Sequence, residues 1–266
     1  MSTLVCFHAH PDDESLSTGG LMAKAAAAGH RVILVTATRG EQGEPQPGVL
    51  APGEPLWQRR VQELGRGGRG PGAEPPRFLG YEDSGMMGTP ANDNPACFWR
   101  ADVSEAADRL AAILAEVEAD VLTIYDPHGL YGHPDHIQVH RVGRLAGERA
   151  GLTHVYEATV GRERAMNGFK AMAAEMEARG LEGSNIDDIP DFGVPEADLA
   201  YLVDVSAHTR AKREALARHR SQVSVENGFL SLPDEYYNQM FALEHFALPG
   251  VFGNGGPQLV ELLPGL

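Results

Sequence analysis

The chain has 266 residues, and 22 lysines and arginines against 37 aspartates and glutamates give it a net charge of −15. No apolar run approaches the roughly 18 residues that a membrane-spanning helix needs, and the acidic balance argues against a nucleic-acid-binding surface. The two cysteines are too few for a disulfide framework, and the N-terminus lacks the pattern of a signal peptide. We therefore expect a cytoplasmic protein that acts on a small molecule.

The first half of the chain alternates strand-like and helix-like segments. Short apolar or β-branched runs predict strands at residues 4–8, 31–38, 77–81, 120–125 and 153–157. Apolar residues at helical spacing predict helices at residues 15–28, 56–64, 103–117 and 134–150. Residues 41–55 are crowded with glycine and proline and predict a long loop. This alternation predicts a Rossmann-like α/β fold, with a mostly parallel sheet and helices on both faces.

The second half is less regular, and we expect an irregular C-terminal part. Its patterns predict a helix near 165–176, an acidic loop at 185–198, a strand at 199–205 and a helix at 207–218. Residues 65–76 hold five glycines and three prolines, a composition that cannot continue the helix before it. With no repeat or linker, we expect residues 1–266 to form a single domain.

Histidines gather after two of the predicted strands. Six of the eleven lie at or beyond the carboxyl ends of the strands at 4–8 and 120–125, namely His8, His10, His128, His133, His136 and His140. In an open α/β sheet, ligands bind at the carboxyl ends of the strands. The sequence therefore predicts a functional site at this edge.

Two similar motifs lie in these segments. Residues 10–14 read His-Pro-Asp-Asp-Glu and residues 133–136 read His-Pro-Asp-His. Acidic residues and proline also favour a helix start, but imidazole beside carboxylate suits a divalent metal such as zinc. His10, Asp13 and His136 together make a His₂Asp set that leaves a coordination position for water. Asp12 and His133 are then the neighbouring groups suited to proton transfer.

The two motifs together resemble those of the PIG-L/LmbE-like family of metal-dependent N-acetylglucosaminyl deacetylases. The resemblance extends over most of the chain, through residues 38–44, 60–64, 83–86 and 212–222. It is strongest with the actinobacterial branch that includes the mycothiol-pathway deacetylase and the mycothiol-conjugate amidase. Residues 65–76 depart from the family pattern, where relatives continue a helix.

The resemblance implies a role for each residue of the two motifs. It implies His10, Asp13 and His136 as metal ligands, Asp12 as the general base and His133 as an electrophilic or acid partner. The expected metal is zinc, with ferrous iron as the alternative that the ligand types do not exclude.

The resemblance also extends to residues outside the metal set. It implies that Tyr131 helps to polarise the carbonyl, and that Arg60, Asp83 and, more weakly, Glu44 bind the sugar. Asp135 either orients His133 through a hydrogen bond or is an acid at a helix N-terminus.

These residues predict zinc-dependent deacetylation of an N-acetylglucosaminide by activated water. One alternative is an amidase that acts on a larger N-acyl glucosaminide, such as a mycothiol conjugate, and another is a non-catalytic sugar-binding module. The expected partner is a small-molecule N-acyl glucosaminide, with no nucleic acid and no membrane, and the oligomeric state is left open.

Two other classes of α/β protein fit the sequence poorly. A dinucleotide-binding protein would have a Gly-x-Gly-x-x-Gly turn after the first strand, where this chain has His-Pro-Asp-Asp. A barrel metallohydrolase would use His8 and His10 with further ligands at late strand ends, whereas His208 and His219 lie in helical sequence.

Overall fold

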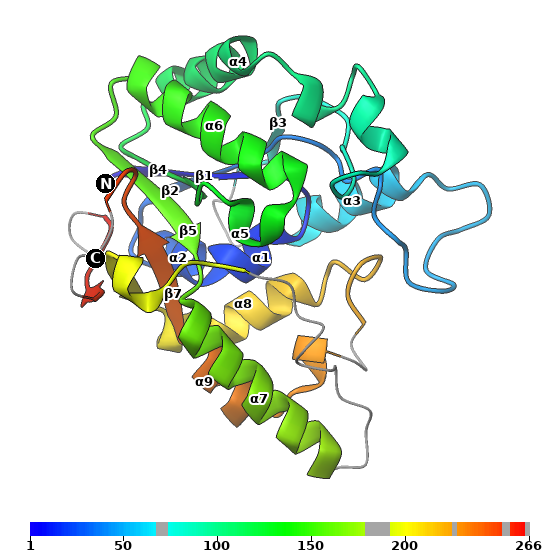
Figure 1. The fold of residues 1–266 in the computed structure, drawn as a ribbon, viewed down its shortest axis with the longest axis vertical. Helices are drawn as coiled ribbons and strands as arrows, with labels where there is room; N and C mark the ends of the chain where they lie inside the picture. Colours follow the sequence, from blue (N-terminus) through cyan, green and yellow to red (C-terminus); the bar gives the residue numbers. More distant parts are fainter. Residues whose placement is uncertain (68–73, 179–191, 225–227, 252–255, 264–266) are drawn as a thin grey trace.

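The computed structural model describes residues 1–67, 74–178, 192–224, 228–251 and 256–263, and an eight-stranded sheet runs through it (Figure 1). The strand order is β3-β2-β1-β4-β5-β7-β6-β8. The strands are β1 (Thr3–His8), β2 (Arg31–Thr36), β3 (Arg77–Phe78), β4 (Val121–Tyr125), β5 (His154–Thr159), β6 (Tyr201–Asp204), β7 (Leu243–Ala247) and β8 (Gln258–Leu259). The strands β1 to β5 pair in parallel, and only β7 is antiparallel to its neighbours, β5 and β6.

Helices cover both faces of this sheet. They are α1 (Asp13–Ser17), α2 (Gly19–Ala27), α3 (Leu56–Gly67), α4 (Val103–Glu116), α5 (Gly129–Gly132), α6 (Pro134–Arg149), α7 (Arg162–Ala178), α8 (Thr209–Leu216) and α9 (Asp234–Phe241). Figure 1 shows α4 and α6 over one face, α1 and α2 on the other, and α7 to α9 gathered beyond α2. Among the described residues, no helix is both long and apolar enough to cross a membrane.

The core divides into two clusters because the side chains of a strand alternate between the faces. Val5 and Phe7 belong to the cluster that also holds the buried residues of α4 and α6, and Leu4 and Cys6 belong to the cluster on the face of α2. A strand that is buried on both faces is mostly apolar rather than alternating, and β1 and β4 are buried at every position. The predicted mostly parallel sheet with helices on both faces is confirmed.

The structure differs from the predicted elements at several boundaries. The helix expected over residues 15–28 is two helices, because Thr18 has a φ of −134° and interrupts the helical path between α1 and α2. Helix α3 continues to Gly67, three residues past its predicted end. Residues 68–73 of the glycine-rich segment and 185–191 of the acidic loop lie outside the described residues. No element was predicted after residue 218, where the structure has α9, β7 and β8.

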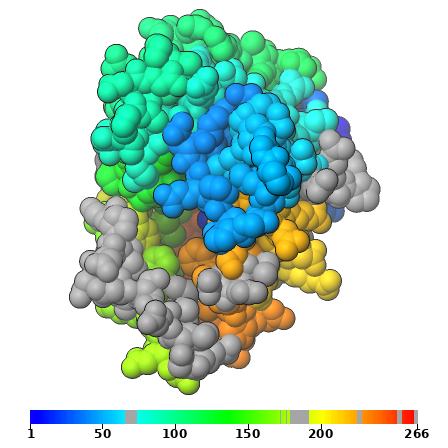
Figure 2. Space-filling view, turned by 90° about the vertical axis from the view of Figure 1, so that its right-hand side faces the viewer, coloured from blue at the N-terminus to red at the C-terminus, as the bar shows by residue number. Residues whose placement is uncertain are grey.

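The C-terminal elements add a second layer of structure beside the sheet edge that carries the histidines. In Figure 2 the yellow and orange segments lie beneath the blue and cyan ones on the same face of the molecule. Helix α8 contacts α1, α2 and α3, which places the second half of the chain against the loops that follow β1.

Candidate active site

The two histidine motifs meet at one edge of the sheet. Strands β1 and β4 are parallel neighbours, so the segments that follow His8 and Tyr125 leave the sheet side by side. The chain order reverses here, since β2 and β3 lie on one side of β1 while β4 and β5 lie on the other. Such a switch point is where open α/β sheets bind ligands.

The rings of His10 and His136 both lie close to one carboxylate oxygen of Asp13. The Oδ2 atom of Asp13 lies 3.3 Å from Nδ1 of His10 and 3.4 Å from Nε2 of His136. The His10 backbone N–H donates to the same oxygen at 2.8 Å, which fixes its position. Ligands at about 2.0–2.1 Å from a tetrahedral zinc lie about 3.3–3.4 Å from one another. The contacts of Asp13 with the two rings therefore have the ligand spacing of a metal site.

Other potential ligands surround His10. Ring nitrogens of His10, His133 and His136 lie within 4.8 Å of one another, and His10 also forms such a group with Asp83 and Asp135. His133 is the N-cap of α6, where its Nδ1 accepts the N–H of Asp135 at 3.1 Å. The ring proton of a neutral His133 is then on Nε2, which makes that atom a hydrogen-bond donor.

The protonation states of the cluster follow from burial and mutual charge. Burial alone would lower the pKa of His10, but the carboxylates of Asp83, Asp13 and Asp135 outweigh it and raise that pKa. Burial lowers the pKa of His133 to about 3, and electrostatic repulsion from the neighbouring rings of His10 and His136 adds to the shift. His133 is therefore neutral at neutral pH.

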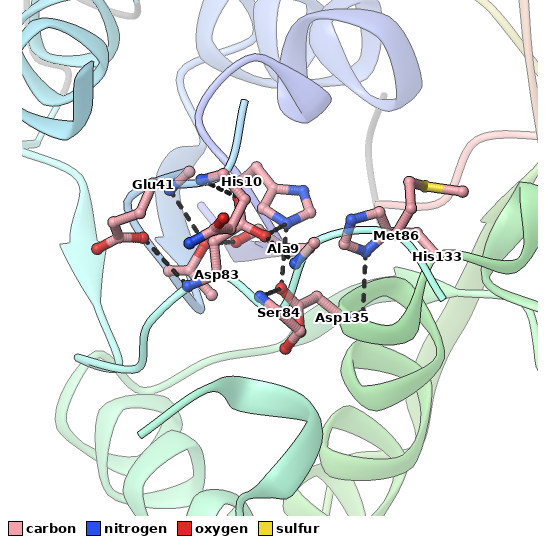
Figure 3. A network of polar contacts seen from close by, with 12 residues as sticks. Ala9, His10, Glu41, Asp83, Ser84, Met86, His133 and Asp135 are labelled. Carbon is pink, nitrogen blue, oxygen red and sulfur yellow. Dashed lines mark hydrogen bonds and ion pairs between the residues drawn. The ribbon is translucent and has the colours of Figure 1, made fainter. Parts of the chain in front are cut away.

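Of the two roles expected for Asp135, the structure has the acid at a helix N-terminus, because the residue lies in the first turn of α6 and its carboxylate contacts His10 rather than the His133 ring. Its Oδ2 lies 3.2 Å from His10 Nε2 and accepts the Ser84 backbone N–H at 2.9 Å, while Oδ1 accepts the Ser84 hydroxyl (Figure 3). The reason is geometric: at the start of α6 the His133 ring accepts the backbone N–H of Asp135, while the Asp135 side chain points to His10 and Ser84.

Asp12 has a strained backbone that several contacts maintain. Its φ of 115° and ψ of −29° lie in a region that residues other than glycine rarely adopt. Its N–H donates to Oε2 of Glu14 at 2.9 Å, and Arg60 Nη2 donates to the carbonyl of Pro11 at 2.8 Å. Burial raises the pKa of Asp12, against the opposing charge of Arg60. A more basic carboxylate in a fixed position suits a proton acceptor.

Arg60 is directed into the protein. Its guanidinium donates to the carbonyls of Gly40 and Pro11 and lies 3.2 Å from Oδ1 of Asp12, and the residue is 4% exposed. Gly40 has a φ of +72°, and a Cβ there would lie 2.3 Å from the guanidinium carbon. Glycine is therefore required at position 40 for the close approach of Arg60. The sugar-binding role of Arg60 stays a prediction.

The remaining predicted residues lie at different depths. Asp83 is buried, and its carboxylate accepts the N–H groups of residues 42 and 85 at 3.1 and 2.8 Å beside His10. Tyr131 places its hydroxyl 3.5 Å from Nε2 of His136, and burial raises its pKa, so the phenol stays protonated. Glu44 is exposed in the loop after β2.

Sequence patterns alone missed several supporting residues. The imidazole of His219 contacts Glu14 at 2.7 Å, so a residue from the second half supports the carboxylate that binds the Asp12 N–H. Ser84 supports Asp135 from the loop after β3. His219 and Ser84 both lie in segments that carry the family resemblance, which was the available signal.

Comparisons with known proteins identify the family of this chain. The chain matches the PIG-L family, described as GlcNAc-PI de-N-acetylase, over residues 5–147. It is 41% identical to the 1D-myo-inositol 2-acetamido-2-deoxy-alpha-D-glucopyranoside deacetylase of Thermomonospora curvata, over 97% of this chain and 96% of the relative. A protein of the same name from Acidothermus cellulolyticus is 40% identical over 92% of this chain and 88% of the relative.

Solved structures share the fold at lower identity. A deacetylase of the teicoplanin biosynthesis pathway superposes with a TM-score of 0.58 at 19% identity, over 92% of this chain and 97% of the other. The N,N'-diacetylchitobiose deacetylase of Pyrococcus horikoshii gives 0.52 at 23% identity, over 89% and 73%. The family match and the relatives at about 40% identity establish that the chain belongs to the PIG-L family.

Proposed function

We propose that this protein hydrolyses the acetamide of an N-acetylglucosaminide, with 1D-myo-inositol 2-acetamido-2-deoxy-α-D-glucopyranoside as substrate and acetate and the free amine as products. The names of the relatives at about 40% identity support this substrate. The observation that carries the proposal is the single oxygen of Asp13 that contacts both His10 and His136, beside the buried carboxylate of Asp12.

We assign His10, Asp13 and His136 as the residues that hold the metal. Asp13 supplies a negative charge and already contacts both rings, whereas His133 uses Nδ1 to cap α6. When bound, zinc or ferrous iron lowers the pKa of a coordinated water from ~15.7 towards ~7 and polarises the amide oxygen. Asp135 would orient His10 through Nε2, as carboxylates beside metal-binding histidines do.

Asp12 moves the proton in this mechanism. As the water oxygen forms a bond to the acetyl carbon, Asp12 accepts the water proton, and it then donates that proton to the sugar nitrogen as the C–N bond breaks. Burial favours the protonated carboxyl and so raises the pKa of Asp12, which suits both steps. The bond from its backbone N–H to Glu14 and the contact of its Oδ1 with Arg60 keep the carboxylate in one place.

His133 and Tyr131 are the hydrogen-bond donors for the developing oxyanion. His133 is neutral with its proton on Nε2, and Tyr131 keeps its phenolic proton, so neither needs to change its protonation state to donate. Fixed donors of this kind stabilise the tetrahedral transition state. His133 therefore fits the electrophilic role rather than that of the acid.

Two variants test the assignment. Asp12→Ala should keep the metal and lose turnover by about 10²–10⁴-fold, because only the proton acceptor is removed. His136→Ala should lose the metal, while His154→Ala, at the exposed start of β5, should change neither property. Metal content by elemental analysis and kcat on the inositol glucosaminide are the measurements. Stoichiometric metal in His136→Ala would refute the ligand assignment.

The products distinguish the alternative functions. Equal amounts of acetate and primary amine indicate the proposed deacetylase. Amine without acetate, from a substrate with a larger acyl group, indicates an amidase. Binding of the sugar with neither product indicates a sugar-binding module.

The cysteines support a cytoplasmic location, which we also propose. Cys6 and Cys97 are both buried free thiols. Burial raises the pKa of Cys6 to about 12, so that this thiol stays protonated. Free thiols are typical of proteins in a reducing compartment.

A further inference from the structure

A buried row of polar side chains lies behind the metal-binding residues. The register of the parallel strands β1 and β4 pairs Cys6 with Thr123, two residues before each strand ends. The last residues of the two strands, His8 and Tyr125, therefore lie side by side. The Tyr125 hydroxyl is 2.7 Å from Nδ1 of His8, and Nε2 of His8 is 2.8 Å from the hydroxyl of Thr18. All three residues of this row are at most 1% exposed, so water does not compete for these hydrogen bonds.

Tyr125 contacts two of the residues that we assign as metal ligands. Its ring stacks on the imidazole of His136, with 4.4 Å between the ring centroids and 12° between the planes. Its hydroxyl forms a hydrogen bond with the carboxylate of Asp13. Burial raises the pKa of this phenol, and the charge of Asp13 adds to the shift, so the hydroxyl keeps its proton. One side chain therefore touches both an imidazole and a carboxylate of the metal-binding set.

The donor and acceptor roles along the row follow from its contact with Asp13. An aspartate carboxylate is ionised at neutral pH and can then only accept hydrogen bonds. The hydroxyl proton of Tyr125 therefore points to Asp13, and the phenol oxygen accepts a proton from Nδ1 of His8. Burial lowers the pKa of His8 to about 4, so the ring is neutral and has a single donor nitrogen. Its Nε2 must then accept the hydroxyl proton of Thr18.

We propose that Tyr125 is a positioning residue for the metal site, and that His8 directs the Tyr125 hydroxyl to Asp13 by donating from Nδ1. The stacked ring sets the plane of the His136 imidazole, and the hydroxyl sets the orientation of the carboxylate. Hydrogen-bond partners of this kind orient metal ligands and strengthen metal binding. The inference deepens the proposed function and rests on its assignment of Asp13 and His136 as ligands.

Zinc affinity separates this role from a contribution to packing alone. Tyr125→Phe keeps the stacked ring but removes the hydrogen bond to Asp13, so it should weaken zinc binding by about 10–100-fold. Thr18→Val is the matched control, because it removes the hydroxyl at the other end of the row and leaves the bond between Tyr125 and Asp13. It should lower the melting temperature, since Nε2 of His8 loses its partner, and keep the zinc affinity of the wild type.

The tautomer of His8 tests the direction of the row without metal or substrate. In the metal-free wild type, the ring-nitrogen NMR shifts of His8, assigned by their loss in His8→Gln, should place the proton on Nδ1. In Tyr125→Phe the proton should move to Nε2, because phenylalanine offers no acceptor whereas the Thr18 hydroxyl can accept it.

Three results would overturn the proposal. A wild-type His8 with its proton on Nε2 would mean that the Tyr125 hydroxyl points to His8. Unchanged zinc affinity in a folded Tyr125→Phe would remove the positioning role, and equal losses in Tyr125→Phe and Thr18→Val would reduce it to packing. If Tyr125→Phe does not fold, the wild-type tautomer still decides the direction of the row. If the wild type binds zinc but releases no acetate, the proposed function fails, and affinity and tautomer still decide this inference.

Discussion

Replacing Asp135 by asparagine tests whether this buried carboxylate holds His10 in place for a metal. Asparagine keeps the shape of the side chain but removes the negative charge that lies 3.2 Å from His10 Nε2. A carboxylate in that position orients the ring and makes its other nitrogen a stronger ligand. The loss of such a contact weakens metal binding by about 10–100-fold, or about 1.4–2.8 kcal/mol.

The assay is zinc affinity by competition with a chromophoric chelator, with thermal melting as the check on folding. Asp102→Asn is the control, because Asp102 caps the N-terminus of α4 by accepting the Glu105 N–H and its side chain contacts none of the described histidines. The weakening should persist in a His133→Ala background, since the carboxylate contacts His10. If Asp135→Asn keeps its zinc affinity and loses only kcat, the residue acts on His133 and our reasoning is wrong.

Two further predictions concern stability. Gly40→Ala should lose more stability than Gly53→Ala. Both positions have a positive φ, but only a Cβ at position 40 meets a side chain, that of Arg60. Urea unfolding of the two variants measures the difference, and equal losses would contradict it. Burial lowers the pKa of His245 to about 4, and the nearby Arg164 adds to the shift. The unfolded chain then binds more protons than the folded chain between pH 6.5 and 4. The contribution of His245 to the free energy of unfolding is therefore fully present above pH 6.5 and is lost as the pH falls towards 4. Between pH 7 and 4.5, wild type should lose about 2–3 kcal/mol more than His245→Asn; parallel pH profiles would refute this.

The parallel half of the sheet could be predicted because its strands are buried on both faces. Runs such as Arg31–Thr36 in β2 are rich in β-branched and apolar residues, a composition that favours a strand over a helix or a loop. Strand β7 has the sequence LEHFA, without a β-branched residue, and its place between β5 and β6 depends on partners distant in sequence. Local patterns therefore did not indicate it.

The metal-binding residues were predictable for a related reason. His10 and His136 each follow a strand of a parallel pair, so strand order alone brings them to one edge. The partner of Asp135 was not predictable in this way. A hydrogen bond to His133, two residues before it, was one of the two roles expected, but the helix start directs the two side chains apart and the contact is made with His10, 125 residues away.

Arg60 combines two tasks that an engineer would wish to change separately. The same guanidinium that is expected to recognise the sugar also holds the Pro11 carbonyl and the Asp12 carboxylate. A substitution made there to broaden substrate choice would also loosen the proton acceptor, so selectivity and rate would change together. New specificity is therefore easier to introduce on α7 and α9, which line a cavity beside Tyr131 and whose described residues make no contact of this kind with Asp12.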